Sequence, residues 1–161
     1  MNTRIVFGLS AFMSLMGSVV FARYYLWAYL LPKGRQNALL HLIAPHLFFR
    51  FIGLSFLVPG VVAASLPAAF AIPAAYGDLG AGILAIAAAI GLSKRASWAI
   101  AAVWIFDVWG AADLLFAIYQ GPRLQIEAGD FGAAFFIPTA IVPPLLVTHA
   151  LIFKLLLRRR P

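Results

Sequence analysis

Ionisable side chains inside long apolar stretches are the residues with which this chain could do chemistry. Two arginines, three aspartates and two histidines lie in such stretches: Arg23, Arg50, Asp78, Asp107, Asp113, His46 and His149. A charged group at the centre of a bilayer costs about 2.5–3.5 kcal/mol on insertion scales, so such groups usually face the interior of a helical bundle and pair with one another. We therefore take these side chains as a candidate ligand or proton pocket.

His46 and Arg50 are four residues apart, so they share one face of a helix. Depth estimates from about 1.5 Å of rise per residue place most of the set in one half of the membrane or at its midplane: Arg23, His46, Arg50, Asp107 and His149. We predict that an Arg50–Asp107 ion pair forms the core of this cluster, because a guanidinium can bind a carboxylate through two parallel hydrogen bonds.

Asp78 and Asp113 form a predicted acidic step in the opposite, outer half, where Arg123 is the one cation near enough to fold back onto them. Two interpretations of the whole set stay open. In the first, the pairs only hold the helices in order. In the second, they line a pocket that binds or translocates a small molecule or a proton.

His46 and His149 allow a further hypothesis, because two histidines at similar depth on different helices can be the axial ligands of a haem b. Arg23 or Arg50 would then face the propionates. No other cofactor and no metal site is expected. A third hypothesis is an accessory subunit, or a homo-oligomer, whose charges pair with a membrane partner. An enzyme with an Asp–His acid–base pair is a further alternative, and no motif specifies a reaction.

The composition excludes a soluble globular domain. Of the 161 residues, 64% are hydrophobic and 11% are charged, whereas soluble domains have about 45–50% apolar and about 25% charged residues. Apolar stretches of about 20 residues recur and are typical of transmembrane helices. The sequence therefore predicts an all-α, polytopic helical bundle in a cell membrane, most simply a bacterial inner membrane. The chain has no cysteine, which excludes disulfides and thiolate chemistry.

Five spans are predicted in a single membrane domain that covers residues 1–161: residues 5–31, 38–66, 73–92, 96–120 and 131–157. The first should end at the turn Pro32-Lys33-Gly34-Arg35. Pro59-Gly60 should kink the second span, and Pro138, Pro143 and Pro144 interrupt the fifth. Interrupted helices at membrane depth are tolerated where they line a cavity, so we expect a cavity inside the bundle.

The net charge of +7 gives the orientation of these spans. Basic residues gather on one side of the predicted membrane: Lys33, Arg35, Lys94, Arg95, Lys154, Arg158, Arg159 and Arg160. Arg4 and Arg123 lie on the other side. The positive-inside rule then predicts an outer N-terminus and a cytoplasmic C-terminus. The expected partner of these charges is the lipid bilayer, because basic residues spread over several turns form no groove for nucleic acid.

Overall fold

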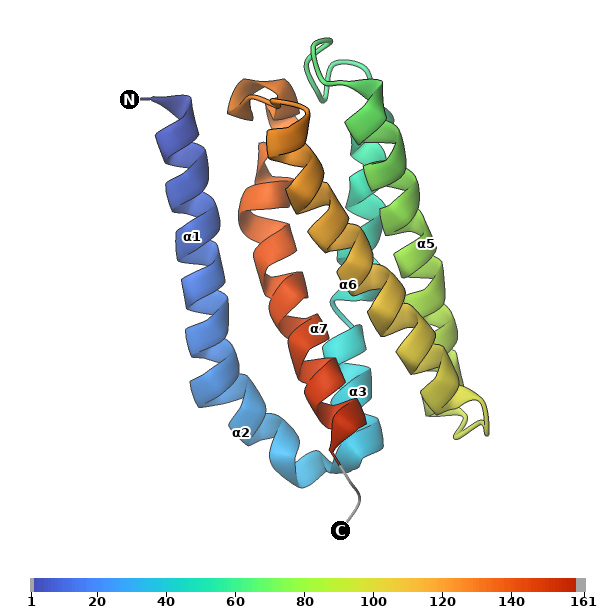
Figure 1. Cartoon of the computed structure of the whole chain (residues 1–161). Coiled ribbons are helices and arrows are strands. Elements are labelled where there is room, and N and C mark those ends of the chain that lie inside the picture. The colour runs from blue at the N-terminus through green and yellow to red at the C-terminus, as the bar shows by residue number, and fades with distance from the viewer. Residues whose placement is uncertain (1, 159–161) are drawn as a thin grey trace.

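The computed structural model describes residues 2–158, which form an all-α bundle without strands (Figure 1). The helices run roughly antiparallel (Figure 1). We call the end of the bundle where α1 begins the N-terminal end, and the opposite end, where α7 finishes, the C-terminal end. In chain order they are α1 (Thr3–Phe21), the π-helix η1 (Ala22–Leu26), α2 (Trp27–Leu30), the 3-10 helix η2 (Leu31–Lys33), α3 (Gly34–Ile43), α4 (His46–Phe49), the 3-10 helix η3 (Arg50–Leu57), α5 (Ala68–Ser93), α6 (Ala99–Arg123), the 3-10 helix η4 (Ala128–Phe135), the π-helix η5 (Ile137–Ile141) and α7 (Val142–Leu157). The predicted basic residues Arg159 and Arg160 lie outside the described residues.

The chain first reverses at Gly34, as the sequence predicts. Gly34 has a φ of 73°, a backbone conformation that glycine adopts without the steric penalty of a Cβ atom. Pro32 lies in the short helix η2 just before it. The turn lets α3 run back along the bundle beside α7.

Four helical stretches of the described chain are long and apolar enough to cross a bilayer: Thr3–Leu57, Ala68–Ser93, Ala99–Arg123 and Ile137–Leu157. The first is 55 residues long and contains the reversal at Gly34, so it passes along the bundle twice (Figure 1). The 26 residues of α5 give a length of about 39 Å, more than the hydrocarbon core of about 30 Å. The four helical stretches therefore make five passes along the bundle, and their boundaries differ from the predicted ones.

The second pass ends at Leu57 and not near residue 66. Pro59 offers no backbone N–H, and Gly60 has a φ of 85°, so this pair ends the helix where we expected a kink. The loop that follows is held by η4, because Ala63 N donates to Asp130 O at 3.0 Å. Pro59-Gly60 is therefore part of an ordered connection at the N-terminal end.

The third helix starts at Ala68, five residues before the predicted boundary at Pro73. Pro67 is its N-cap, and Pro73 lies inside the helix. A proline early in a helix lacks an N–H that would bond the preceding turn, but it does not force the chain to stop there. This earlier start places every later residue of α5 deeper in the bundle than the sequence indicated.

The fourth and fifth passes also shift. Helix α6 covers Ala99–Arg123 against the predicted 96–120. The predicted fifth span, 131–157, is a succession of η4, η5 and α7. Gly132 has a non-helical backbone inside η4, and Pro138 and Pro143 lie at the starts of η5 and α7. The prolines thus open new helical segments, because their missing N–H groups would be unpaired in a first turn anyway.

Two apolar clusters form the core of the bundle. The one near the C-terminal end includes Leu39, Val103 and Ile152. The other lies near the N-terminal end and contains a group of phenylalanines with Ala74 and Ala75. On α5, α6 and α7, the buried ionisable residues lie between the positions that supply these two clusters. The charged groups are therefore enclosed by apolar side chains on both sides.

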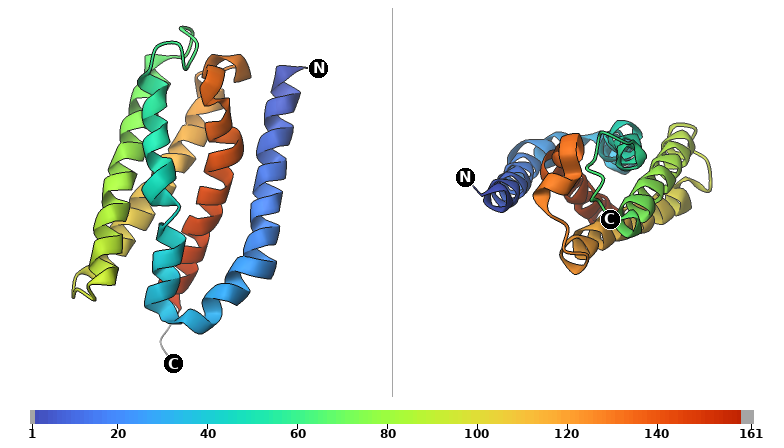
Figure 2. Two further views of the ribbon diagram at one scale, coloured as in Figure 1. Left: turned by 180° about the vertical axis from the view of Figure 1, so that it is seen from behind. Right: turned by 90° about the horizontal axis from the view of Figure 1, so that it is seen from above.

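Helix α1 is the most loosely packed of the long helices. None of its side chains is buried, and it packs mainly against α7 and η5. Viewed along the bundle, it lies at one edge, with α5 and α6 at the opposite edge (Figure 2). Its start is tied to η4 by an exposed ion pair in which Arg4 Nε donates to Glu127 Oε2 at 2.7 Å. This hydrogen bond lowers the pKa of Glu127.

Candidate functional site

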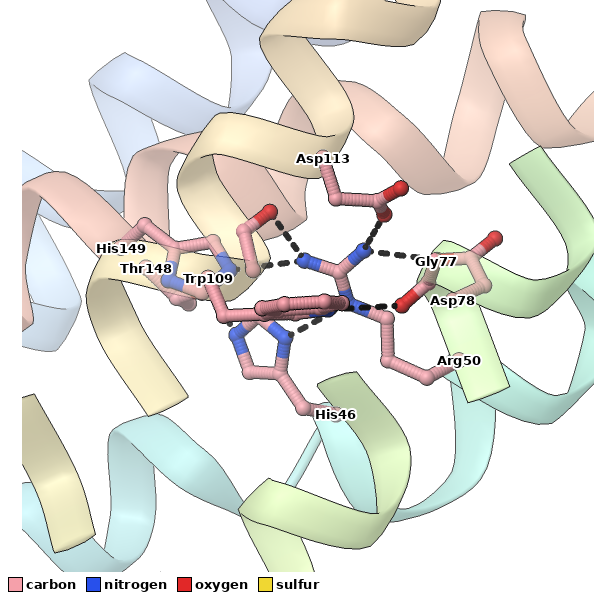
Figure 3. A network of polar contacts seen from close by, with 9 residues as sticks. His46, Arg50, Gly77, Asp78, Trp109, Asp113, Thr148 and His149 are labelled. Carbon is pink, nitrogen blue, oxygen red and sulfur yellow. Dashed lines mark hydrogen bonds and ion pairs between the residues drawn. The ribbon is translucent and has the colours of Figure 1, made fainter. Parts of the chain in front are cut away.

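Arg50 is the centre of a buried polar network that connects four passes of the chain. Pro45 ends the regular α3, His46 opens α4, and Arg50 begins the 3-10 helix η3 one turn later. This short, tightly wound segment turns both side chains toward α5, α6 and α7 (Figure 3). The Arg50 side chain has no exposed surface.

All five N–H groups of the Arg50 guanidinium have an acceptor. Such complete pairing is needed because an unpaired donor at this depth is costly. The acceptors come from α4, α5, α6 and α7: His46 Nδ1 at 3.4 Å from Nε, Asp78 Oδ1 at 2.6 Å and Asp113 Oδ2 at 2.9 Å from Nη1, and Gly110 O at 2.7 Å and His149 Nε2 at 2.8 Å from Nη2. One cation therefore holds together helices that are far apart in the sequence.

The contacts of Arg50 assign the tautomers of both histidines. Arginine only donates, so Nε2 of His149 accepts and its Nδ1 carries the proton, which it donates to Asp107 Oδ1 at 2.6 Å. By the same reasoning, Nδ1 of His46 accepts and its Nε2 donates to Thr148 Oγ1 at 2.9 Å. Both imidazoles are neutral in this arrangement, so they add no positive charge to the network.

The predicted Arg50–Asp107 ion pair is wrong: the acids bound to Arg50 are Asp78 and Asp113, and Asp107 binds His149. A span that starts at Pro73, as predicted, would have Asp78 close to its end. Because α5 begins at Ala68, Asp78 lies further along the helix. Ten residues of helix put it about 15 Å from the start of α5, level with Arg50. Asp107 and Asp113 point about 120° apart around α6, so only one of them can meet the guanidinium.

Arg23 does not join the network. It is exposed in η1, on the edge helix, with its guanidinium carbon 6.0 Å from the ring centre of Tyr24. The prediction used depth along the helix, which says nothing about the direction of a side chain around the helix axis. The structure thus brings together six of the seven predicted residues and leaves Arg23 outside. Arg123 does not reach the two acids either, because its side chain donates to Gln120 Oε1 at 2.8 Å.

Three glycines make room for the network, and sequence reasoning missed this role. A Cβ atom on Gly53 would collide with the carboxyl group of Asp78, and one on Gly77 with that of Asp113. On Gly110, it would lie 2.7 Å from a ring carbon of His149. Glycine is common in membrane helices as a packing residue, so nothing in the sequence distinguishes these three from the others.

The network has more acid than base. The network contains one guanidinium and three carboxyl groups, and the imidazoles are neutral, so full ionisation would leave two negative charges uncompensated. Asp107 Oδ2 is buried and has no hydrogen-bond partner among the described residues. Uncompensated charge is very unfavourable in a medium of low dielectric. The network therefore favours the uptake of protons or of another cation.

A cavity of about 480 Å³ adjoins the network toward the N-terminal end. Its walls come from α1, η3, α5, α6, η4, η5 and α7 and are almost entirely apolar, and Pro138 and Pro143 of the interrupted fifth pass are part of them. Asp78 and Asp113 also line it, each with 11% of its side chain exposed. Pockets for small molecules have volumes of about 300–1,000 Å³ and a few polar groups in an apolar lining. The cavity has this size and character.

A haem between His46 and His149 does not fit the observed arrangement. The two ring centres are 4.4 Å apart, so the rings are in contact, with no space for a porphyrin between them. Each neutral imidazole has one lone pair for a metal, and both lone pairs accept from Arg50. The haem alternative would require the network to open. Within residues 2–158, no group of three or more His, Asp or Glu side chains is placed to hold a metal ion.

These features define the class of the protein: an all-helical bundle whose helices are long and apolar enough to cross a bilayer, with a charged network in its core. Residues 6–157 match the family described as Domain of unknown function (DUF8737), and the chain belongs to this family. No curated protein and no solved structure matches the chain.

Proposed function

We propose that this chain is an integral membrane protein that binds a small, largely apolar molecule in the cavity and takes up or releases a proton or cation at Asp78 and Asp113. The observation that carries the proposal is the position of these two carboxyl groups. They line an apolar cavity of about 480 Å³ and share one nitrogen of a fully buried arginine. A molecule bound in the cavity would therefore lie next to the carboxyl groups that pair with Arg50.

A purely structural role accounts for less of the site. One carboxylate would neutralise Arg50, and backbone carbonyls such as that of Gly110 could satisfy its other donors. The two further buried acids carry a desolvation penalty that their hydrogen bonds to Arg50 and His149 must offset. An accessory subunit whose charges pair with a partner is also less well supported, because Arg50, His46 and Asp107 have no exposed surface to offer a partner.

The proposal includes the membrane topology: five spans, with the N-terminal end of the bundle outside and the C-terminal end in the cytoplasm. Single cysteines test it, because the chain contains none. Ser93, the last residue of α5, lies before the turn into α6, and Gln125 follows the end of α6; both positions are exposed, and each is changed to cysteine in turn. A membrane-impermeant maleimide should label Gln125→Cys in intact cells and Ser93→Cys only after lysis. Reversed labelling would contradict the orientation, and labelling of both in intact cells would contradict a crossing by α6.

Occupancy of the cavity is tested with a photoreactive fatty alcohol that carries a diazirine. The purified protein in phosphatidylcholine nanodiscs should be labelled on cavity residues, which peptide mass spectrometry identifies. Ala117→Phe should weaken this labelling, because Ala117 lines the cavity and the larger ring occupies part of it. Ala101→Phe is the matched control: the same change at an exposed position of the same helix should leave the labelling unchanged. Labelling that spreads over the lipid-facing surface and is insensitive to Ala117→Phe would refute the proposal.

A further inference from the structure

We infer that the molecule bound in the cavity is a hydrophobic amine, an apolar body with a single positively charged nitrogen that lies against Asp78 and Asp113. The inference rests on the proposed function and specifies its ligand class. It follows from the charges at the floor of the cavity, from the groups that are missing from its lining and from its aromatic wall.

Two carboxyl groups, those of Asp78 and Asp113, form the floor of the cavity. Arg50 Nη1 is shared by Asp78 Oδ1 and Asp113 Oδ2, so two carboxyl groups compete for one cation. Their other oxygens, Asp78 Oδ2 and Asp113 Oδ1, lie against Gly53 and Gly77 and accept no hydrogen bond from the described residues. A ligand ammonium supplies one positive charge and up to three N–H donors, which is what this floor lacks.

The lining of the cavity argues against an anion. No lysine, arginine or histidine is among the described residues that line it. Arg50 lies behind the two carboxyl groups, and all its donors are engaged. A carboxylate or phosphate in the cavity would meet negative charge and find no free donor. The lining therefore discriminates between head groups by repulsion as well as by attraction.

A group of phenylalanines forms the apolar wall. Phe131 stacks on Phe7, with ring centres 5.6 Å apart, and meets Phe70 edge to face at 5.7 Å. Phe56 completes the group, and all four line the cavity. Aromatic faces attract alkyl groups and also cations, most strongly where water is excluded. They suit the hydrocarbon part of an amine and the methylene groups next to its nitrogen.

The route into the cavity also indicates an apolar ligand. Phe12 and Leu15 of α1 line the cavity and are themselves 57% and 39% exposed. In a bilayer, these exposed surfaces would face lipid tails. A molecule that is dissolved in the membrane can therefore reach the cavity beside α1, the helix without buried side chains.

Three photoreactive probes with the same diazirine-bearing alkyl chain test the inference: a primary amine, an alcohol and a carboxylic acid. In phosphatidylcholine nanodiscs, the amine should label the cavity at about tenfold lower concentration than the alcohol, a difference of about 1.4 kcal/mol. The acid should label it least. In Asp113→Asn, the amine should lose its advantage over the alcohol, whereas Ala101→Phe, a change at an exposed position of the same helix, should keep that advantage.

The outcomes separate the two proposals. If Asp113→Asn does not yield folded protein, Asp78→Asn is the second variant with the same expectation. Equal labelling of the cavity by the amine and the alcohol overturns the cationic head group and leaves the proposed function standing. Stronger labelling by the acid than by the amine also overturns the cationic head group. Absence of cavity labelling by all three probes overturns the proposed function itself.

Discussion

Arg50→Met should prevent recovery of a stable, monodisperse protein. The substitution leaves Asp78, Asp113 and the acceptor atoms of both histidines buried without their common donor. Removal of one partner from a buried ion pair costs about 3–5 kcal/mol, a large part of the stability of a chain of this size. Detergent extraction, size-exclusion chromatography and thermal unfolding measure the effect.

Matched variants show whether the loss comes from the network. Arg23→Met makes the same change at an exposed position and should alter the stability by less than about 0.5 kcal/mol. Arg50→Met combined with Asp78→Asn and Asp113→Asn should recover part of the lost protein, because no buried acid remains beside the lost cation. Arg50→Lys should be intermediate, since an ammonium has three donors for five acceptors. Normal stability of Arg50→Met alone would show that the network contributes little.

Gly110→Ala should destabilise the protein by about 1–3 kcal/mol, the range for overpacking a buried site. The added methyl group would lie 2.7 Å from Cε1 of His149 and 2.9 Å from Nη2 of Arg50. Both side chains must move, and the hydrogen bond between Arg50 and the carbonyl oxygen of Gly110 must lengthen. Thermal unfolding in detergent is the measurement.

Gly121→Ala is the control for Gly110→Ala. It lies on the same helix, and a Cβ atom there meets nothing within 4 Å. Because alanine favours a helix by about 1 kcal/mol over glycine, this variant should be as stable as the wild type or more stable. If both variants change the stability in the same direction and by the same amount, the effect is one of helix propensity and the tight fit around Gly110 has no energetic weight.

Much of the fold follows from hydropathy. The all-α class, the five passes and the reversal at Gly34 need only apolar runs of sufficient length and one residue that tolerates a positive φ. The boundaries were less predictable. Pro59-Gly60 ends a helix and Pro73 does not begin one, because a proline limits the local hydrogen bonds while contacts with other segments decide where the helix stops.

The composition of the candidate site was predictable, but its pairing was not. Ionisable residues in apolar segments tend to face one another in the interior of a bundle. Six of the seven predicted side chains lie together in the network. The partner of Arg50 depended on a five-residue shift in the start of α5 and on the direction of Asp107 around α6. Arg23 is exposed and outside the network, because the direction of a side chain around its helix is set by how that helix packs.

The sequence by itself determined that seven ionisable groups lie in apolar segments, and the energy of a charge in hydrocarbon is the reason why these groups matter. Only the tertiary structure decided that Arg50 serves Asp78 and Asp113, that His149 holds Asp107, and that three glycines leave space for them. It also placed the apolar cavity against the two carboxyl groups. The physical reason is that depth and residue type are properties of a segment, whereas hydrogen-bond partners and empty volume arise only between segments.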